Sequence, residues 1–291
     1  MSAIIERTLG FDDEDFVFLG GVNRMTRLIF LAVTNTALAC ANLGQESWII
    51  TEEDEVELGA RFNQDLLAQM PEYKGNEAVL NYVRSIGEEI ARVSDRPPND
   101  VLKYHFTVVD SDEINAFAIP GGYVYVTKGL LKAATTSAEV ATVLGHEVGH
   151  IAARHGVKSM EIQFGAALLG QLLGSGEIAK LVQEAISLGT GLVFDQDQER
   201  EADKLGVDFA LRAGWNPWGM VDFFEYLQTI EPKGDDLGPL TKLGELFSSH
   251  PPTSERIENV TTQIQAYGVD RNASGYRWES DTELSQIKAM L

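Results

Sequence analysis

The chain has 291 residues and a formal net charge of −21, from 44 acidic and 23 basic side chains. This charge repels nucleic-acid phosphates, so we expect no nucleic-acid partner, and a solvated acidic surface explains it without any special role. The length suits one large folded domain with short extensions. We therefore predict a leader over residues 1–45, a domain over 46–270 and a C-terminal tail over 271–291.

The leader contains the only cysteine, Cys40, so no intramolecular disulfide can form. A short apolar stretch over 28–39 ends at this cysteine and resembles the secretory signal of a bacterial lipoprotein. The acidic residues 12–15 do not suit such a signal, although a start at Met25 would remove them. Two interpretations stay open. Either the protein is periplasmic, with lipid-anchored or peripheral membrane association through Cys40, or it is a soluble cytoplasmic protein with an uncleaved leader.

The first folded elements combine two helices and a small sheet. Residues 51–96 repeat apolar side chains at three- and four-residue steps, which predicts two amphipathic helices. Residues 104–110, 116–119 and 122–127 have the β-branched and aromatic composition of strands, and we expect them to form an antiparallel sheet. The Pro-Gly-Gly sequence at 120–122 predicts a turn with positive φ angles.

Helical periodicity returns at Ser137, which we expect to be an N-cap, and further helices are predicted near 196–213, 217–229 and 253–267. The fold class is therefore α+β and mainly helical. No segment has the roughly 20 uninterrupted apolar residues of a membrane helix. The apolar segment 164–174 is shorter and belongs to a helical hairpin over 157–194 that either packs on the domain or contacts a membrane surface.

The motif with the clearest chemistry is His146-Glu147-Val148-Gly149-His150, inside the helix that begins near Ser137. Two histidines four residues apart lie on one helical face and can reach one metal ion. Glu147 lies beside them, where it can act as general base on a water that zinc makes acidic. The flanking residues are uncharged, as a buried active-site helix requires. This pattern predicts one Zn²⁺ per chain.

A catalytic zinc site needs a third protein ligand. Glu199 and Asp203 are also four residues apart on a predicted helix, so one carboxylate could bind the metal while the other orients a ligating histidine. Spacing alone leaves a second interpretation equally open, in which these residues belong to a solvated acidic helix face.

Four sequence blocks in order resemble the gluzincin metallopeptidase family of the CAAX prenyl proteases and HtpX, in its soluble periplasmic branch. These blocks are NAFAIPGGYVYVTKGLL at 115–131, HEVGHIAARHG at 146–156, DQEREADKLG at 197–206 and SHPPTSERI at 249–257. The resemblance implies a zincin-like domain in which the active-site helix packs on a small sheet. It also implies that Glu199 is the third zinc ligand and that Asp203 orients a histidine ligand.

The resemblance implies two further roles, and a third position has two open interpretations. The strand edge at Asn115 and Ala116 would pair with an extended substrate backbone. His250 would approach the zinc and either block its open position or stabilise the oxyanion, and a plain loop histidine is the alternative. Arg256 pairs with an active-site carboxylate or forms an exposed salt bridge.

Three other positions receive more modest interpretations. We assign His105 and His155 to structure, because His155 is off the ligand face and His105 lies in a predicted strand, where a core or surface histidine is common. Phe194-Asp195 replaces the Ser-Arg that is common in the family, which leaves the ligands intact but changes the support of the second ligand helix.

These observations predict a zinc metalloendopeptidase that hydrolyses internal peptide bonds with Glu147 as general base. The resemblance implies that His250 is also catalytic and that the substrates are unfolded or misassembled envelope proteins. Two rivals belong to other classes. One is a chaperone-like assembly factor whose zinc site His250 keeps mostly closed. The other is a structural zinc domain, against which the presence of Glu147 argues, because a structural site has no use for a general base. The sequence predicts neither the physiological substrate nor the oligomeric state.

Overall fold

The structure is a computed structural model that describes residues 50–164, 194–230, 250, 253–278 and 282–291. Residues 50–291 form one compact unit. The predicted leader with Cys40 and most of the apolar segment 164–174 lie outside the described residues. In the described part of the chain, no helix is both long and apolar enough to cross a membrane.

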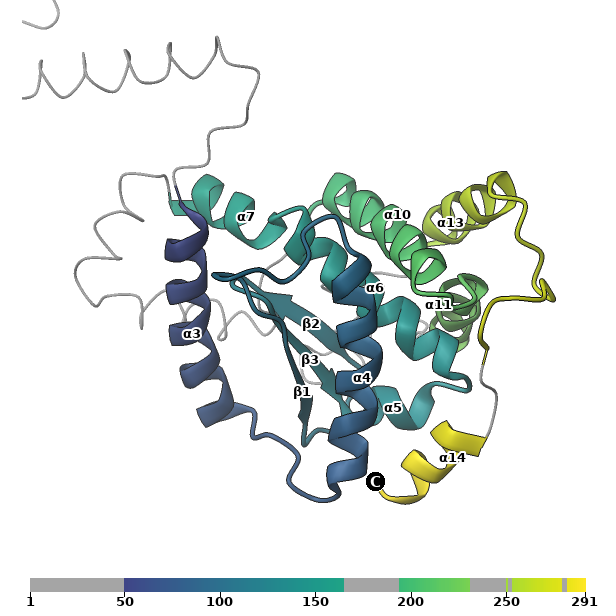
Figure 1. Cartoon of the computed structure of the whole chain (residues 1–291), viewed down its shortest axis with the longest axis horizontal. Helices are drawn as coiled ribbons and strands as arrows, with labels where there is room; N and C mark the ends of the chain where they lie inside the picture. The colour runs from purple at the N-terminus through teal and green to yellow at the C-terminus, as the bar shows by residue number, and fades with distance from the viewer. Residues whose placement is uncertain (1–49, 165–193, 231–249, 251–252, 279–281) are drawn as a thin grey trace, which may run out of the picture. The chain divides into compact units, whose positions relative to one another are not determined.

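The elements follow the predicted order (Figure 1). The helices before and after the sheet are α3 (Glu52–Gln69), α4 (Glu77–Val93), α5 (Lys128–Ala133), α6 (Ser137–Ala152), α7 (His155–Phe164), α10 (Gln196–Arg212), α11 (Trp218–Ile230), α13 (Ser254–Ala266) and α14 (Thr282–Ala289). The strands are β1 (His105–Val109), β2 (Ala116–Ile119) and β3 (Tyr123–Thr127). The mainly helical α+β fold is confirmed.

The sheet is mixed, with strand order β1-β3-β2. The predicted antiparallel pairing is found between β2 and β3, which Gly121 and Gly122 connect with φ angles of 82° and 91°. It is wrong for β1, which pairs with β3 in parallel. A tight turn specifies an antiparallel hairpin, whereas nothing in the composition of β1 specifies its direction or its place beside β3.

The sheet is buried on both faces because its side chains alternate between two apolar clusters. The face toward α4 and α6 carries Phe106, Val108, Ala116, Ala118, Val124 and Val126. The face toward α3 carries Val109, Phe117, Ile119 and Tyr125, which pack with Leu58, Phe62 and Leu66 of that helix. The sheet therefore separates α3 from α4 and α6, and it holds α6 in place through β2.

Small residues let α6 and α10 approach closely. A Cβ added at Gly145 would lie 3.0 Å from the carbonyl oxygen of Gly206, and one added at Gly149 would lie 3.0 Å from that of Ala202. A Cβ added at Gly206 would lie 2.9 Å from the backbone nitrogen of His146. The two helices that carry the predicted metal ligands are therefore in near-backbone contact.

Local hydrogen bonds set where these helices begin. Thr136, rather than the predicted Ser137, caps α6 by accepting from the backbone N–H of Glu139. Ser137 is the first helical residue, and its hydroxyl accepts from Tyr82. Asp195 caps α10 in a capping box with Gln198.

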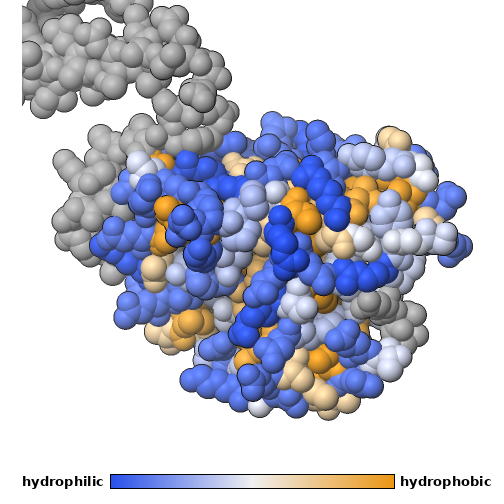
Figure 2. All heavy atoms as spheres, in the orientation of Figure 1, coloured by the Kyte–Doolittle hydropathy of each residue, from blue (hydrophilic) through white to orange (hydrophobic). Residues whose placement is uncertain are grey.

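The C-terminal segment packs on the same unit. Leu284 and Ile287 of α14 are buried in the larger apolar cluster, and the hydroxyl of Tyr73 donates to the carbonyl of Met290. Figure 2 shows mainly hydrophilic residues on the face in view, in keeping with the acidic composition.

Candidate metal centre

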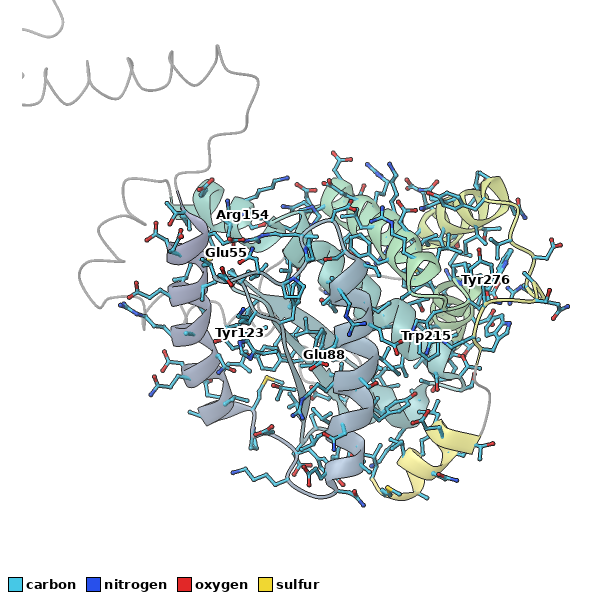
Figure 3. The ribbon with its side chains drawn as sticks, viewed as in Figure 1. Glu55, Glu88, Tyr123, Arg154, Trp215 and Tyr276 are labelled. Atoms are coloured by element: carbon cyan, nitrogen blue, oxygen red, sulfur yellow. The ribbon has the colours of Figure 1, made fainter. Side chains whose placement is uncertain are left out.

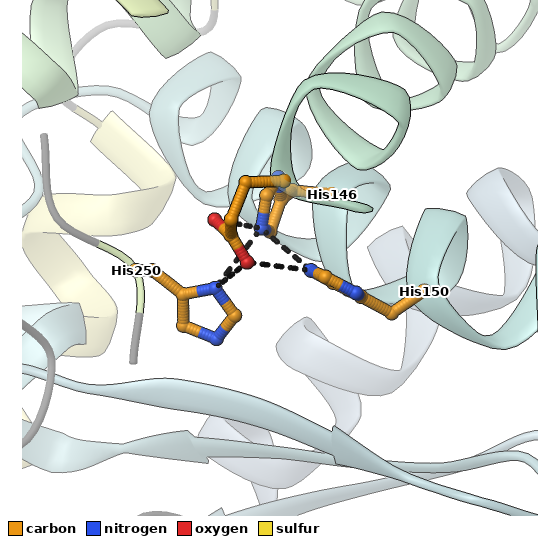
Figure 4. A group of neighbouring side chains, drawn as sticks. His146, His150 and His250 are labelled. Atoms are coloured by element: carbon orange, nitrogen blue, oxygen red, sulfur yellow. Dashed lines mark hydrogen bonds and ion pairs between the residues drawn. The ribbon is translucent and has the colours of Figure 1, made fainter. Parts of the chain in front are cut away.

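Four buried side chains converge, two from α6, one from α10 and one from His250, four residues before α13. One ligand atom from each of His146, His150, Glu199 and His250 lies within 4.8 Å of all the others. The Nε2 atoms of His146 and His150 are 3.0 Å apart, and Glu199 Oε1 is 3.3 Å from His150 Nε2 (Figure 4). Two nitrogens bound to one tetrahedral zinc at about 2.0–2.1 Å are about 3.3 Å apart, so this spacing fits a shared metal ion.

Glu147 lies next to this cluster with one oxygen aimed at no donor. Its side chain is 2 % exposed, and among the described residues nothing donates a hydrogen bond to its Oε2 atom. A buried carboxylate oxygen without a donor is costly unless something binds there. Its position suits a water or a substrate group held between Glu147 and the metal ligands.

Asp203 and Arg256 contact the candidate ligands directly. Asp203 Oδ1 is 2.9 Å from His146 Nδ1, and His146 Nε2 lies in the cluster. Arg256 donates to both Asp203 oxygens at 2.7 and 2.6 Å and is 2.9 Å from Glu199 Oε2. Arg256 is buried, so of its two predicted interpretations the structure shows the active-site pairing.

Burial and neighbouring charges set the protonation of the cluster. Burial lowers the pKa of His150 well below its ordinary value, which leaves a neutral imidazole able to bind metal. Burial raises the pKa of Glu147, and the nearby His250 opposes that rise only in part. Burial would also raise the pKa of Glu199, but His250 and His150 together lower it well below the ordinary value. The carboxylate of Glu199 is therefore charged.

His250 is part of the cluster rather than a plain loop histidine. Its Nδ1 atom is 2.8 Å from Glu199 Oε1 and 3.3 Å from His146 Nε2. Its Nε2 atom is 3.9 Å from Glu147 Oε1. The imidazole thus lies between the first three ligand atoms and the carboxylate that we expect to act as base.

Two residues contact His150 in ways that the sequence did not reveal. His155 Nδ1 is 2.9 Å from His150 Nδ1, although we expected His155 to lie away from the ligands. Phe194 stacks on the His150 ring with centroids 3.9 Å apart. The sequence pattern assumed a continuing helix after His150, whereas the helix ends at Ala152 and the chain turns back.

The predicted substrate edge adjoins the cluster. Ala116, the first residue of the edge strand β2, lines a pocket with His146 and Glu147. The remaining lining residues are Thr142, Val143, Met220, Phe223, Phe224, Leu227, His250 and Arg256. Asn115 and all four residues of β2 are buried.

Comparison with known proteins agrees with this geometry. Residues 77–264, nearly two thirds of the chain, match the model of Peptidase family M48. The metalloprotease LoiP of Escherichia coli (strain K12) is 31% identical over 171 residues, 57% of this chain and 64% of that protein. The beta-barrel assembly-enhancing protease of the same strain is 27% identical over 218 residues, 71% of this chain and 43% of that protein.

A relative from a plant is also similar. The mitochondrial metalloendopeptidase OMA1 of Arabidopsis thaliana is 34% identical over 155 residues, 53% of this chain and 30% of that protein. The chain spans less than two thirds of the length of each of these three relatives.

Proposed function

The chain belongs to peptidase family M48, as its motifs predicted, and we propose that it is a zinc-dependent metalloendopeptidase. The observation that carries this proposal is the buried cluster of His146, His150 and Glu199, beside a Glu147 oxygen that has no hydrogen-bond partner in the described part of the chain. Two imidazoles and a carboxylate are a donor set that catalytic zinc sites use. One Zn²⁺ per chain would bind to these three residues.

Bound zinc supplies Lewis acidity, which polarises a carbonyl and lets a water molecule lose a proton near neutral pH. Glu147 accepts that proton at Oε2 and returns it to the leaving amine as the peptide bond breaks. Asp203 keeps Nε2 of His146 turned toward the metal, and Arg256 holds Asp203 in place.

His250 acts as a gate in this proposal. Its Nδ1 atom is 2.8 Å from Glu199 Oε1 and 3.3 Å from His146 Nε2, and we infer that a substrate carbonyl would need the same space. Once the His250 side chain leaves this position, the same imidazole can donate to the developing oxyanion. Removing its side chain is therefore expected to open the site while weakening transition-state stabilisation.

The edge strand β2 would bind substrate by adding a strand at Asn115 and Ala116. Such recognition reads the peptide backbone and suits unfolded or misassembled chains, because only extended segments can pair there. Since β2 is buried, substrate pairing requires that this edge be uncovered. One relative is named a beta-barrel assembly-enhancing protease, which supports misassembled envelope proteins as substrates and a periplasmic location. The lipid anchor at Cys40 rests on the sequence alone, where this cysteine follows a short apolar stretch.

Cleavage of casein by the full chain, with bound zinc measured, tests the proposal. We expect one zinc per chain in the parent protein and in Glu147→Gln, with cleavage lost only in the latter. His250→Ala should retain zinc and cleave at an altered rate. His105→Ala provides a matched control, because His105 lies on β1, the edge strand opposite β2, and stacks on Tyr123.

Two outcomes would contradict the proposal. Parent protein without bound zinc would refute the metal site. Bound zinc without cleavage by the parent or by His250→Ala would refute the peptidase and favour the assembly factor with a closed site.

A further inference from the structure

The metal-facing nitrogen of His150 depends on what its other nitrogen contacts. His150 Nδ1 is 2.9 Å from His155 Nδ1, and His155 Nε2 is 3.1 Å from Glu201 Oε2. His155 is fully buried, whereas the Glu201 side chain is 52% exposed. A continuous chain of hydrogen bonds thus runs from the solvent-exposed face of α10 to the cluster of candidate metal ligands.

The turn after α6 brings His155 to this position. Arg154 has a φ of 56°, a left-handed conformation that reverses the chain between α6 and α7. Its guanidinium donates to the buried Glu55 at 2.8 Å and to the carbonyl of Ile50 at 2.7 Å (Figure 3). These contacts with the start of α3 compensate for the strained backbone and fix where α7 begins.

Only one arrangement of protons satisfies both contacts and leaves His150 able to bind metal. The Glu201 carboxylate can only accept, so His155 Nε2 carries a hydrogen. In a neutral His155, Nδ1 is then an acceptor, and His150 Nδ1 must donate to it. The remaining nitrogen of His150, Nε2, keeps its lone pair, and it is the atom that faces His146 and Glu199.

The reverse arrangement would destroy the site. If His155 Nδ1 donated to His150 Nδ1, the hydrogen of a neutral His150 would move to Nε2 and point into the cluster. An imidazole with N–H toward the metal cannot be a ligand. The carboxylate at the outer end therefore selects the useful tautomer at the inner end.

We propose that Glu201 and His155 are positioning residues that fix the tautomer and ring orientation of His150 for metal binding. Phe194 stacks on the His150 ring and restricts the rotation of that ring. This inference rests on the metal site of the proposed function, but it concerns metal affinity and not the rate of hydrolysis.

Two substitutions of similar size at His155 test the inference. In His155→Asn, the side-chain oxygen replaces Nδ1 as acceptor, whereas His155→Leu has similar volume and accepts nothing. Zinc dissociation constants of the full chain are measured by competition with a chromophoric chelator. We expect His155→Leu to weaken zinc binding about 10- to 100-fold and His155→Asn to weaken it less than about fivefold.

Glu201 provides a second test that does not disturb the interior. In Glu201→Gln the amide can donate as well as accept, so we expect zinc binding to weaken about 3- to 10-fold. Asp197→Asn is the matched control, since Asp197 lies exposed on the same helix and pairs with Arg200 at the surface. If His155→Leu does not fold in the absence of zinc, as judged by its thermal unfolding, the comparison at Glu201 decides.

The outcomes separate this inference from the proposed function. A parent protein that does not bind zinc overturns both. If the parent binds zinc but His155→Asn and His155→Leu bind it equally well, only the role of Glu201 and His155 is overturned. The same holds if Glu201→Gln and Asp197→Asn bind zinc equally well. A purely structural role for His155 would affect Asn and Leu alike.

Discussion

Replacement of Arg256 by methionine should be among the most destabilising changes in the site. The Arg256 side chain is 6% exposed and lies between two buried carboxylates, with contacts to Asp203 at 2.6 Å and to Glu199 at 2.9 Å. Removing the guanidinium leaves both carboxylates without their closest strong positive charge. Breaking a buried pair in this way costs about 3–5 kcal/mol, a large fraction of the 5–15 kcal/mol of a typical domain.

Arg200 provides the matched comparison, because it also lies between two carboxylates, those of Asp197 and Glu255. Its side chain is 41% exposed, and water screens both pairs. Arg200→Met should therefore leave the free energy of unfolding nearly unchanged.

The free energies of unfolding should be measured by urea denaturation in excess chelator, so that bound metal does not contribute. Arg256→Met should then lose about 3–5 kcal/mol, clearly more than Arg200→Met. Equal losses, to within about 0.5 kcal/mol, would refute the reasoning that burial makes the Arg256 network energetically dominant.

Three further predictions concern the metal ligands and the helices that carry them. Gly206→Ala should separate α6 from α10, because its Cβ would lie 2.9 Å from the backbone nitrogen of His146. We expect this overpacking to lower the free energy of unfolding in urea by about 1–3 kcal/mol and to weaken zinc binding. Asp203→Asn should weaken zinc binding about 10- to 100-fold in a chelator competition, since an amide is a poorer partner for His146 Nδ1–H, and unchanged affinity would contradict the orienting role of Asp203. Removal of zinc by chelation should abolish cleavage but leave the far-ultraviolet circular dichroism spectrum that of a folded protein, because two apolar clusters hold the sheet without metal. Cooperative unfolding on chelation would instead support the structural zinc domain.

The helices and the ligand spacing could be predicted because they depend on local periodicity. His146 and His150 are one turn apart, and Glu199 and Asp203 repeat the same step, so each pair lies on one face of its helix. Spacing could not show that α10 packs on α6. That contact depends on Gly145, Gly149 and Gly206, whose common role becomes visible only when both helices are placed together.

The direction of β1 could not be predicted for a related reason. Both faces of the sheet are buried, so apolar residues occupy both sets of alternating positions in β2 and β3. Such strands carry no hydrophobic alternation that would fix their neighbours or register. Only the hairpin between β2 and β3, which two glycines with positive φ connect, had a local signal.

The replacement of Ser-Arg by Phe194-Asp195 shows how a local departure can leave a site supported. Asp195 caps α10 through the backbone N–H of Gln198, so the helix that carries Glu199 begins with a satisfied N-terminus. Phe194, one residue earlier, places its ring against His150 and so connects the start of α10 to a ligand on α6. A polar serine at 194 could not fill that apolar contact. In this chain two residues outside α6 therefore orient His150: Phe194 stacks on its ring, and His155 is hydrogen-bonded to it. The ligand face of α6 alone could not predict either contact.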